Sequence, residues 1–168
     1  MQLLPGLSKD LDLAIIIVVH RKAGESLLAD LMRDKTPWPV KEVEEKDLIE
    51  NRTVYIAPSD YHLLIEKDKT FSLDFSEKLH YSRPAIDISF ETAAEAYGGS
   101  LIAVLLSGAN SDGAEGLKKI KAGGGLTIVQ DPSEATVSYM PEQAIGIFQP
   151  DYVSKTKEII KIINKLAG

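Results

Sequence analysis

The amino-acid sequence predicts an α/β fold, with a three-layer, doubly wound and mostly parallel sheet and a small hairpin at its edge. Residues 13–19 and 101–106 form apolar runs, the first of them rich in β-branched side chains, which suit strands buried on both faces. Segments with helical spacing, such as 86–97 and 114–122, alternate with these runs. Strands that alternate with helices are typical of a parallel sheet covered on both sides.

Each element follows from local periodicity and from the glycines and prolines that interrupt it. The expected strands are 13–19, 40–43, 53–57, 101–106 and 126–130; the expected helices are 25–33, 86–97, 114–122 and 154–166; and 63–66 with 70–73 is expected to form the hairpin. Residues 1–4 resemble the end of an apolar helix that Pro5 and Gly6 stop.

Two helix boundaries carry specific signals. Gly123, Gly124 and Gly125 are expected to end the helix at 114–122, because glycine adopts the left-handed conformation of a helix cap. Pro141 is expected as the first residue of a short helix, where its missing N–H costs nothing.

Composition limits the function. The 168 residues suit one domain spanning 1–168, and the net charge of −6 without a basic cluster argues against a nucleic-acid partner. The absence of cysteine excludes disulfides, thiolate metal sites and cysteine nucleophiles. No apolar run approaches the roughly 20 residues of a membrane span, and no signal peptide is recognisable. A cytoplasmic protein that is not inserted in the membrane is expected.

Two residues stand where apolar strands end. His20 follows the run at 13–19, and Asp112 lies in the small-residue turn after 101–106. Ligands of parallel α/β sheets bind at the carboxyl ends of strands. An imidazole and a carboxylate at that edge are two members of a Ser-His-Asp hydrolytic triad.

Each of these residues also has a simpler interpretation. Asp112 could cap the helix that follows it, and His20 could be a half-buried histidine bonded to backbone groups. Arg83 and Asp87 are compatible with binding a polar substrate or with the start of a helix. His62 and His80 lack metal-type spacing, so neither a metal nor another cofactor is expected.

The glycines of the Asp112 turn allow a third interpretation. Gly108, Gly113 and Gly116 suggest a phosphate cradle of a small-ligand or nucleotide-binding module. Their spacing fits neither the dinucleotide fingerprint nor the P-loop, so this is the weakest hypothesis.

A serine nucleophile is not evident. No Gly-x-Ser-x-Gly elbow occurs in the chain. Ser107 and Ser111 are so close to Asp112 in sequence that they are not expected also to face the far side of His20, and Ser8 lies in a loop without glycine.

Motifs in order along almost the whole chain resemble the catalytic domain of the chemotaxis protein-glutamate methylesterases (CheB). They are the His20 strand, Val54-Tyr55-Ile56-Ala57-Pro58 with Asp60-Tyr61-His62, Arg83-Pro84 with Asp87, Glu95-Ala96-Tyr97-Gly98, Leu106-Ser107-Gly108, Ser111-Asp112-Gly113, Gly124-Gly125-Leu126-Thr127-Ile128-Val129-Gln130-Asp131-Pro132, and Met140-Pro141 with Ala144-Ile145.

The resemblance implies a Ser-His-Asp hydrolase that removes methyl groups from glutamyl methyl esters on chemoreceptors, and in many members also deamidates receptor glutamines. His20 matches the general base and Asp112 the acid that orients it; Ala109 and Gly108 match the lining of the site, where Ala109 would serve the oxyanion through its backbone N–H. The family serine lies in a Gly-x-Ser-x-Gly-Gly turn on a strand upstream of the His20 strand. The chain is therefore expected to be an N-terminally incomplete catalytic domain, inactive alone.

The resemblance also implies partners, and the chain differs from the family pattern at several positions. Methyl-accepting receptors are the expected partners, with a phosphorelay receiver domain or a methyltransferase module as further ones; no receiver domain is expected within 1–168. Ala109 stands where methionine is common, Ser59 replaces a usual glycine, and Arg21-Lys22 replaces Met-Pro in a way that would retune receptor docking. The alternative is a non-catalytic receptor-binding or signalling domain derived from the same fold.

Overall fold

A computed structural model describes residues 2–21 and 27–168 of the chain. Its elements are η1 (Leu4–Gly6), β1 (Ile15–Ile17), α1 (Leu28–Arg33), β2 (Val40–Glu42), β3 (Val54–Ile56), β4 (His62–Ile65), β5 (Phe71–Asp74), α2 (Ile86–Tyr97), η2 (Gly98–Ser100), β6 (Ile102–Leu105), α3 (Ala114–Ala122), β7 (Leu126–Gln130), α4 (Tyr139–Ile147), β8 (Tyr152–Ser154) and α5 (Thr156–Leu166).

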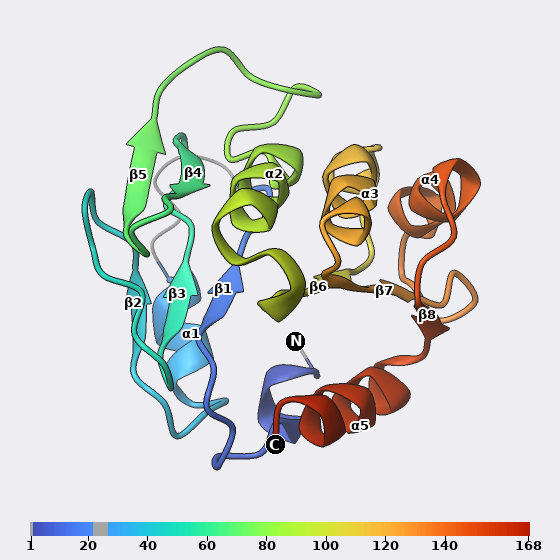
Figure 1. Cartoon of the computed structure of the whole chain (residues 1–168), viewed down its shortest axis with the longest axis horizontal. Helices are drawn as coiled ribbons and strands as arrows, with labels where there is room; N and C mark the ends of the chain where they lie inside the picture. The colour runs from blue at the N-terminus through green and yellow to red at the C-terminus, as the bar shows by residue number, and fades with distance from the viewer. Residues whose placement is uncertain (1, 22–26) are drawn as a thin grey trace.

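The strands form two parallel sheets and one hairpin. The first sheet has the order β1-β3-β2 and the second the order β6-β7-β8, while β4 and β5 pair antiparallel. Figure 1 shows α2, α3 and α4 on one side of the second sheet and α5 on the other. The α/β class with mostly parallel strands and an edge hairpin is therefore confirmed.

Most predicted elements occur close to their expected bounds, and the differences have physical causes. β1 covers only Ile15–Ile17 rather than 13–19, because it is hydrogen-bonded to β3 alone. Strand β8 was not predicted, since its Tyr152 and Val153 are exposed and lack the apolar run of a buried strand. The start of the predicted helix at 25–33 lies outside the described residues, and α1 begins at Leu28.

The helix boundaries predicted from Pro141 and from the glycines at 123–125 differ in detail from those in the structure. Pro141 is the third residue of α4 rather than the first. The N–H groups of the first helical turn have no acceptor within the helix, so proline loses no hydrogen bond at this position either. At the end of α3, Gly124 has a φ of 86° and supplies the left-handed conformation, one residue beyond the cap Gly123. Of the helix expected at 1–4, Gln2 and Leu3 are not helical and Leu4 begins the short turn η1, while Met1 lies outside the described residues.

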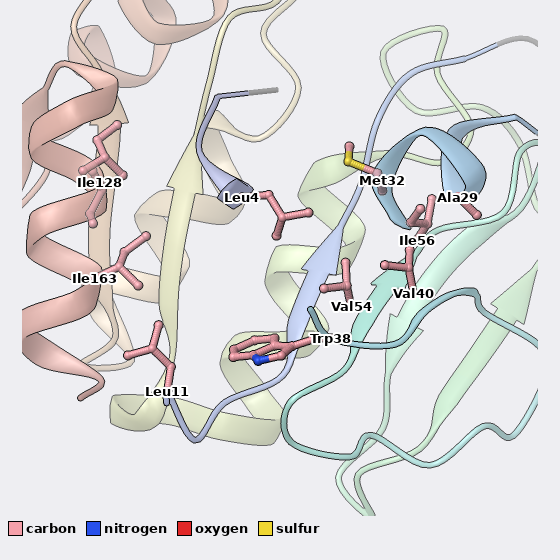
Figure 2. Packing of buried hydrophobic residues seen from close by; sticks show 11 residues of the cluster. Leu4, Leu11, Ala29, Met32, Trp38, Val40, Val54, Ile56, Ile128 and Ile163 are labelled. Atoms are coloured by element: carbon pink, nitrogen blue, oxygen red, sulfur yellow. The ribbon is translucent and has the colours of Figure 1, made fainter. Parts of the chain in front are cut away.

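One hydrophobic cluster connects the two parallel sheets. Its buried members come from both of them, from α5 and from the segment before β1, and Figure 2 labels most of them: Leu4, Leu11, Ala29, Met32, Trp38, Val40, Val54, Ile56, Ile128, Ile159 and Ile163. Within the described residues no ladder joins β1 to β6. Side-chain packing therefore joins the two sheets where no ladder of strand hydrogen bonds does.

Candidate active site

His20 and Asp112 meet at the carboxyl edge of the strands. His20 follows β1 by three residues and Asp112 follows β6 by seven, so each lies beyond the carboxyl end of a strand in a parallel sheet. The Nε2 atom of His20 lies 2.6 Å from Oδ2 of Asp112. The side chain of Asp112 is fully buried, whereas that of His20 is 28% exposed. The histidine is thus oriented by a buried acid and still reachable from solvent.

Backbone N–H groups of helix α2 fix the carboxylate of Asp112. Ile86 N–H donates to Oδ2 at 2.6 Å and Asp87 N–H to Oδ1 at 2.9 Å. Helix α3 begins after Gly113, whose N–H does not bond to Asp112. The simpler interpretation of Asp112 as the cap of its own helix is therefore wrong: it caps α2, a different helix, and holds His20 with the same carboxylate.

These contacts set the charge of Asp112. Burial by itself would raise the pKa of Asp112, but the hydrogen bond with His20 and the N–H donors of Asp87 and Ile86 outweigh burial and hold that pKa below its usual range. The carboxylate is therefore ionised at neutral pH, as a group that stabilises an imidazolium must be.

Stability should depend on pH through Asp112. Its folded-state pKa is lowered, so its contribution is present above the ordinary value of 3.8 and is lost as pH falls through the folded-state value. We expect Asp112→Asn to be most destabilising near pH 7 and its deficit against wild type to shrink below about pH 4 in urea unfolding.

The control for this experiment is Asp87→Asn, for which the sign is reversed. Burial, the largest cause, and the neighbouring Asp112 raise the pKa of Asp87, while N–H donors of Gly116 and Gly113 and the nearby His80 lower it less. The free energy of unfolding of wild type should therefore fall relative to that of Asp87→Asn as pH rises through and above 3.8. Parallel pH profiles for the two variants would show that at least one of the two assignments is wrong.

A pocket of about 390 Å³ opens beside His20. Its lining comes from the ends of β1 and β3 and from the segment before α2: His20, Arg21, Asp60, Lys78, Tyr81, Ser82 and Arg83. Arg83 is held by Asp60 at 2.8 Å, and Arg21 by Glu42 at 2.5 Å and by the carbonyl of Ala57. The volume suits a side chain of a substrate rather than a large cofactor. Lys22, the second residue of the Arg21-Lys22 departure, lies outside the described residues.

The turn between β6 and α3 offers free backbone donors. The N–H of Gly108 donates to the carbonyl of Val137 at 3.1 Å. The N–H groups of Ala109, Asn110 and Ser111 have no acceptor among the described residues. Successive free N–H groups bind anions, so Ala109 is better suited than Gly108 to face an oxyanion.

The same turn does not favour a phosphate cradle. The N–H groups of Gly113 and Gly116 donate to Oδ1 of Asp87 at 3.0 and 2.7 Å. A carboxylate of the protein itself thus occupies the position that a phosphate would take at the start of α3. The nucleotide-binding hypothesis is therefore disfavoured by the geometry.

None of the serines considered from the sequence bonds to His20 in the described part of the chain. Ser107 bonds to the backbone of Val137, and Ser8 Oγ accepts from the N–H of Asp10. The sequence reasoning missed Ser82, which lines the pocket. Its hydroxyl accepts from the Asn110 amide at 3.3 Å and has no hydrogen bond to His20.

The other histidines have separate roles. His62 is fully buried: its Nδ1 accepts from Ala85 N–H, and its Nε2 lies 2.8 Å from the carbonyl of Glu77. His80 contacts Asp87. Across residues 2–21 and 27–168, no group of three potential metal ligands gathers, and no helix is both long and apolar enough to cross a bilayer.

Comparison with known proteins identifies the family. The model of the CheB methylesterase family matches residues 1–163. The chain belongs to the CheB methylesterase family. The crystal structure of the Thermotoga maritima CheB methylesterase catalytic domain superposes with a TM-score of 0.93 at 34% identity, covering 98% of this chain and 89% of that one.

Relatives of the CheB methylesterase family agree with this. A putative protein-glutamate methylesterase/protein-glutamine glutaminase of Leptospira interrogans is 48% identical over 98% of this chain and 86% of its own length. The protein-glutamate methylesterase/protein-glutamine glutaminase of Pyrococcus horikoshii is 33% identical, and this chain spans 46% of its length.

Proposed function

We propose that this chain is the catalytic region of a protein-glutamate methylesterase that hydrolyses glutamyl methyl esters on chemoreceptors. The observation that carries the proposal is the His20–Asp112 pair, with a buried ionised acid at 2.6 Å from an accessible imidazole beside an open pocket. A domain that only bound receptors would have no use for this pair.

In this proposal a serine hydroxyl attacks the ester carbonyl and His20 takes its proton. The tetrahedral intermediate expels methanol, with His20 returning the proton to the leaving oxygen. His20 then activates a water that hydrolyses the acyl-enzyme and regenerates the serine. Asp112 stabilises the imidazolium, and the N–H of Ala109 donates to the oxyanion. The ring nitrogen available for these transfers is Nδ1, because Nε2 faces Asp112.

We propose further that the serine lies outside residues 1–168, on a strand that inserts between β1 and β6. Each of these strands pairs in parallel with its one neighbour and stands at the end of its three-stranded order. Ile15, Ile16 and Ile17 of β1 and Ile102 and Val104 of β6 are only partly buried, although they are strongly apolar. A strand between them would satisfy both edges and end beside His20.

The remaining parts of the proposal concern its setting. Methyl-accepting receptors are the partners, with a receiver domain or a methyltransferase module as a regulatory one. The reaction takes place in the cytoplasm and belongs to chemotactic signalling. Hydrolysis of a glutamine amide at the same site follows the same steps, with ammonia as the leaving group.

Methanol release from methylated receptor tests the proposal. The 168-residue chain should release methanol at background rate. The same chain extended by its in-frame upstream coding sequence should be active, and His20→Ala should abolish that activity. Family-like activity of the 168-residue chain would overturn the external serine. A folded but inactive extended protein that still binds receptor would favour the non-catalytic alternative.

A further inference from the structure

Helices α2 and α3 cap each other's amino ends with a pair of aspartates. Asp112, before α3, accepts the N–H groups of Ile86 and Asp87 at the start of α2. Asp87, in the first turn of α2, accepts the N–H groups of Gly113 and Gly116 at the start of α3. Neither helix has a side-chain cap from its own N-cap residue. The position of each carboxylate therefore depends on the other.

The two helices approach closely at this point. A Cβ atom on Gly116 would lie 3.0 Å from the Cα and the carbonyl oxygen of Asp87, so only glycine fits without movement of the backbone. The contact leaves little freedom for Asp87 to shift. Any displacement of its carboxylate would move the turn that carries Asp112.

The second oxygen of Asp87 holds the segment that lines the pocket. Its Oδ2 lies 3.2 Å from Nε2 of His80, and the side chains are 3% and 38% exposed. His80 and Tyr81 form a two-residue turn that Leu79 and Ser82 close with hydrogen bonds in both directions. Their φ values of 50° and 62° are left-handed, a conformation unfavourable for residues with side chains. Such a turn persists only where other contacts hold it.

We propose that Asp87 is a positioning residue for the His20–Asp112 pair and that, through His80, it also holds residues 78–82 against the pocket. The inference rests on the proposed function for its catalytic meaning. One buried side chain thus links the orienting acid to the substrate-facing segment. Burial is the largest cause that raises the pKa of Asp87, because the buried site disfavours the charged carboxylate.

The first test uses the hydrogen-bonded imidazole N–H proton of His20, observed by NMR in the 168-residue chain and assigned by its loss in His20→Gln. Asp87→Ala removes the acceptor of both N–H groups at the start of α3, those of Gly113 and Gly116, and should abolish this resonance through exchange with water. Asp87→Asn keeps an oxygen that accepts from Gly113 and Gly116, and should retain it. His80→Gln should retain it as well, because that residue holds only the pocket segment.

Each outcome of this test has a meaning. A resonance that persists in folded Asp87→Ala, or that is lost equally in Asp87→Asn, would contradict the proposal that the hydrogen bonds of Asp87 position the His20–Asp112 pair. If Asp87→Ala does not fold, Asp87→Glu replaces it: the longer side chain keeps the charge but displaces the caps, and the resonance should weaken. Absence of the resonance in the unmodified chain would instead contradict the His20–Asp112 pair and the proposed function.

The second test measures how readily residues 78–82 open, from the rate of chymotrypsin cleavage after Tyr81, which is 98% exposed. His80→Ala and Asp87→Ala should speed this cleavage at least about threefold, because proteolysis follows local opening. Asp87→Asn should change it less, since its amide can still bond His80. Cleavage after Tyr139, on α4, is the internal control and should not change. Equal rates of cleavage after Tyr81 in all variants would contradict the proposal that Asp87, through His80, holds residues 78–82 against the pocket.

Discussion

Asp112→Asn should lower the turnover of methyl-ester hydrolysis about 10⁴-fold in the protein that carries the serine, as the same change does in serine-protease triads. The carboxylate has three hydrogen-bond partners among the described residues: His20 Nε2 and the N–H groups of Ile86 and Asp87. An amide has one oxygen for these partners, and its NH₂ group would face a donor or force His20 into the wrong tautomer. The measurement is kcat for methanol release from methylated receptor.

The matched control is Asp12→Asn, an exposed aspartate paired loosely with Arg52 at 3.7 Å. It should leave kcat within about twofold, since exposed ion pairs contribute little. Binding of receptor by Asp112→Asn should persist, because the acid is buried and does not line the pocket. A loss of activity below tenfold would show that Asp112 is a structural cap of α2 and not the orienting acid.

Much of the fold was predictable because local pattern and tertiary role coincide. The predicted bounds of α2, α3 and β7 match the structure, since their periodicity lies within each element and glycines follow directly after α2 and α3. β8 was missed because its exposed side chains resemble those of a loop. β1 was predicted too long because its extent depends on how many strands pair with it, and that is set by distant residues.

The candidate site could be predicted in part. His20 and Asp112 were identified from their places after apolar strands, but each retained a local explanation. Their separation of 92 residues means that only the folded chain shows them together. The capping of α2 by Asp112, and of α3 by Asp87, could not be predicted, because each acid precedes or begins one helix and bonds to another. Local capping rules consider only the helix next in sequence.

Leu11→Ala should reduce the free energy of unfolding of the 168-residue chain by about 2–5 kcal/mol. Leu11 lies before β1, is 1% exposed, and belongs to the cluster that joins the two parallel sheets (Figure 2). In the part of the chain that the structure describes, no strand ladder connects β1 to β6, so this packing carries the cohesion that hydrogen bonds give to a continuous sheet. Urea unfolding, compared at equal m-values, measures the loss.

The matched control is Leu31→Ala on α1, where the leucine is 57% exposed. The same atoms are deleted there without a buried cavity, and the change should stay within about 0.5 kcal/mol. Leu11→Met, which keeps the volume, should cost less than about 1.5 kcal/mol. If Leu11→Ala cost no more than Leu31→Ala, the two sheets would not depend on this cluster. A strand between β1 and β6 would then have to supply that cohesion in the extended protein, and adding it should stabilise the chain regardless of Leu11.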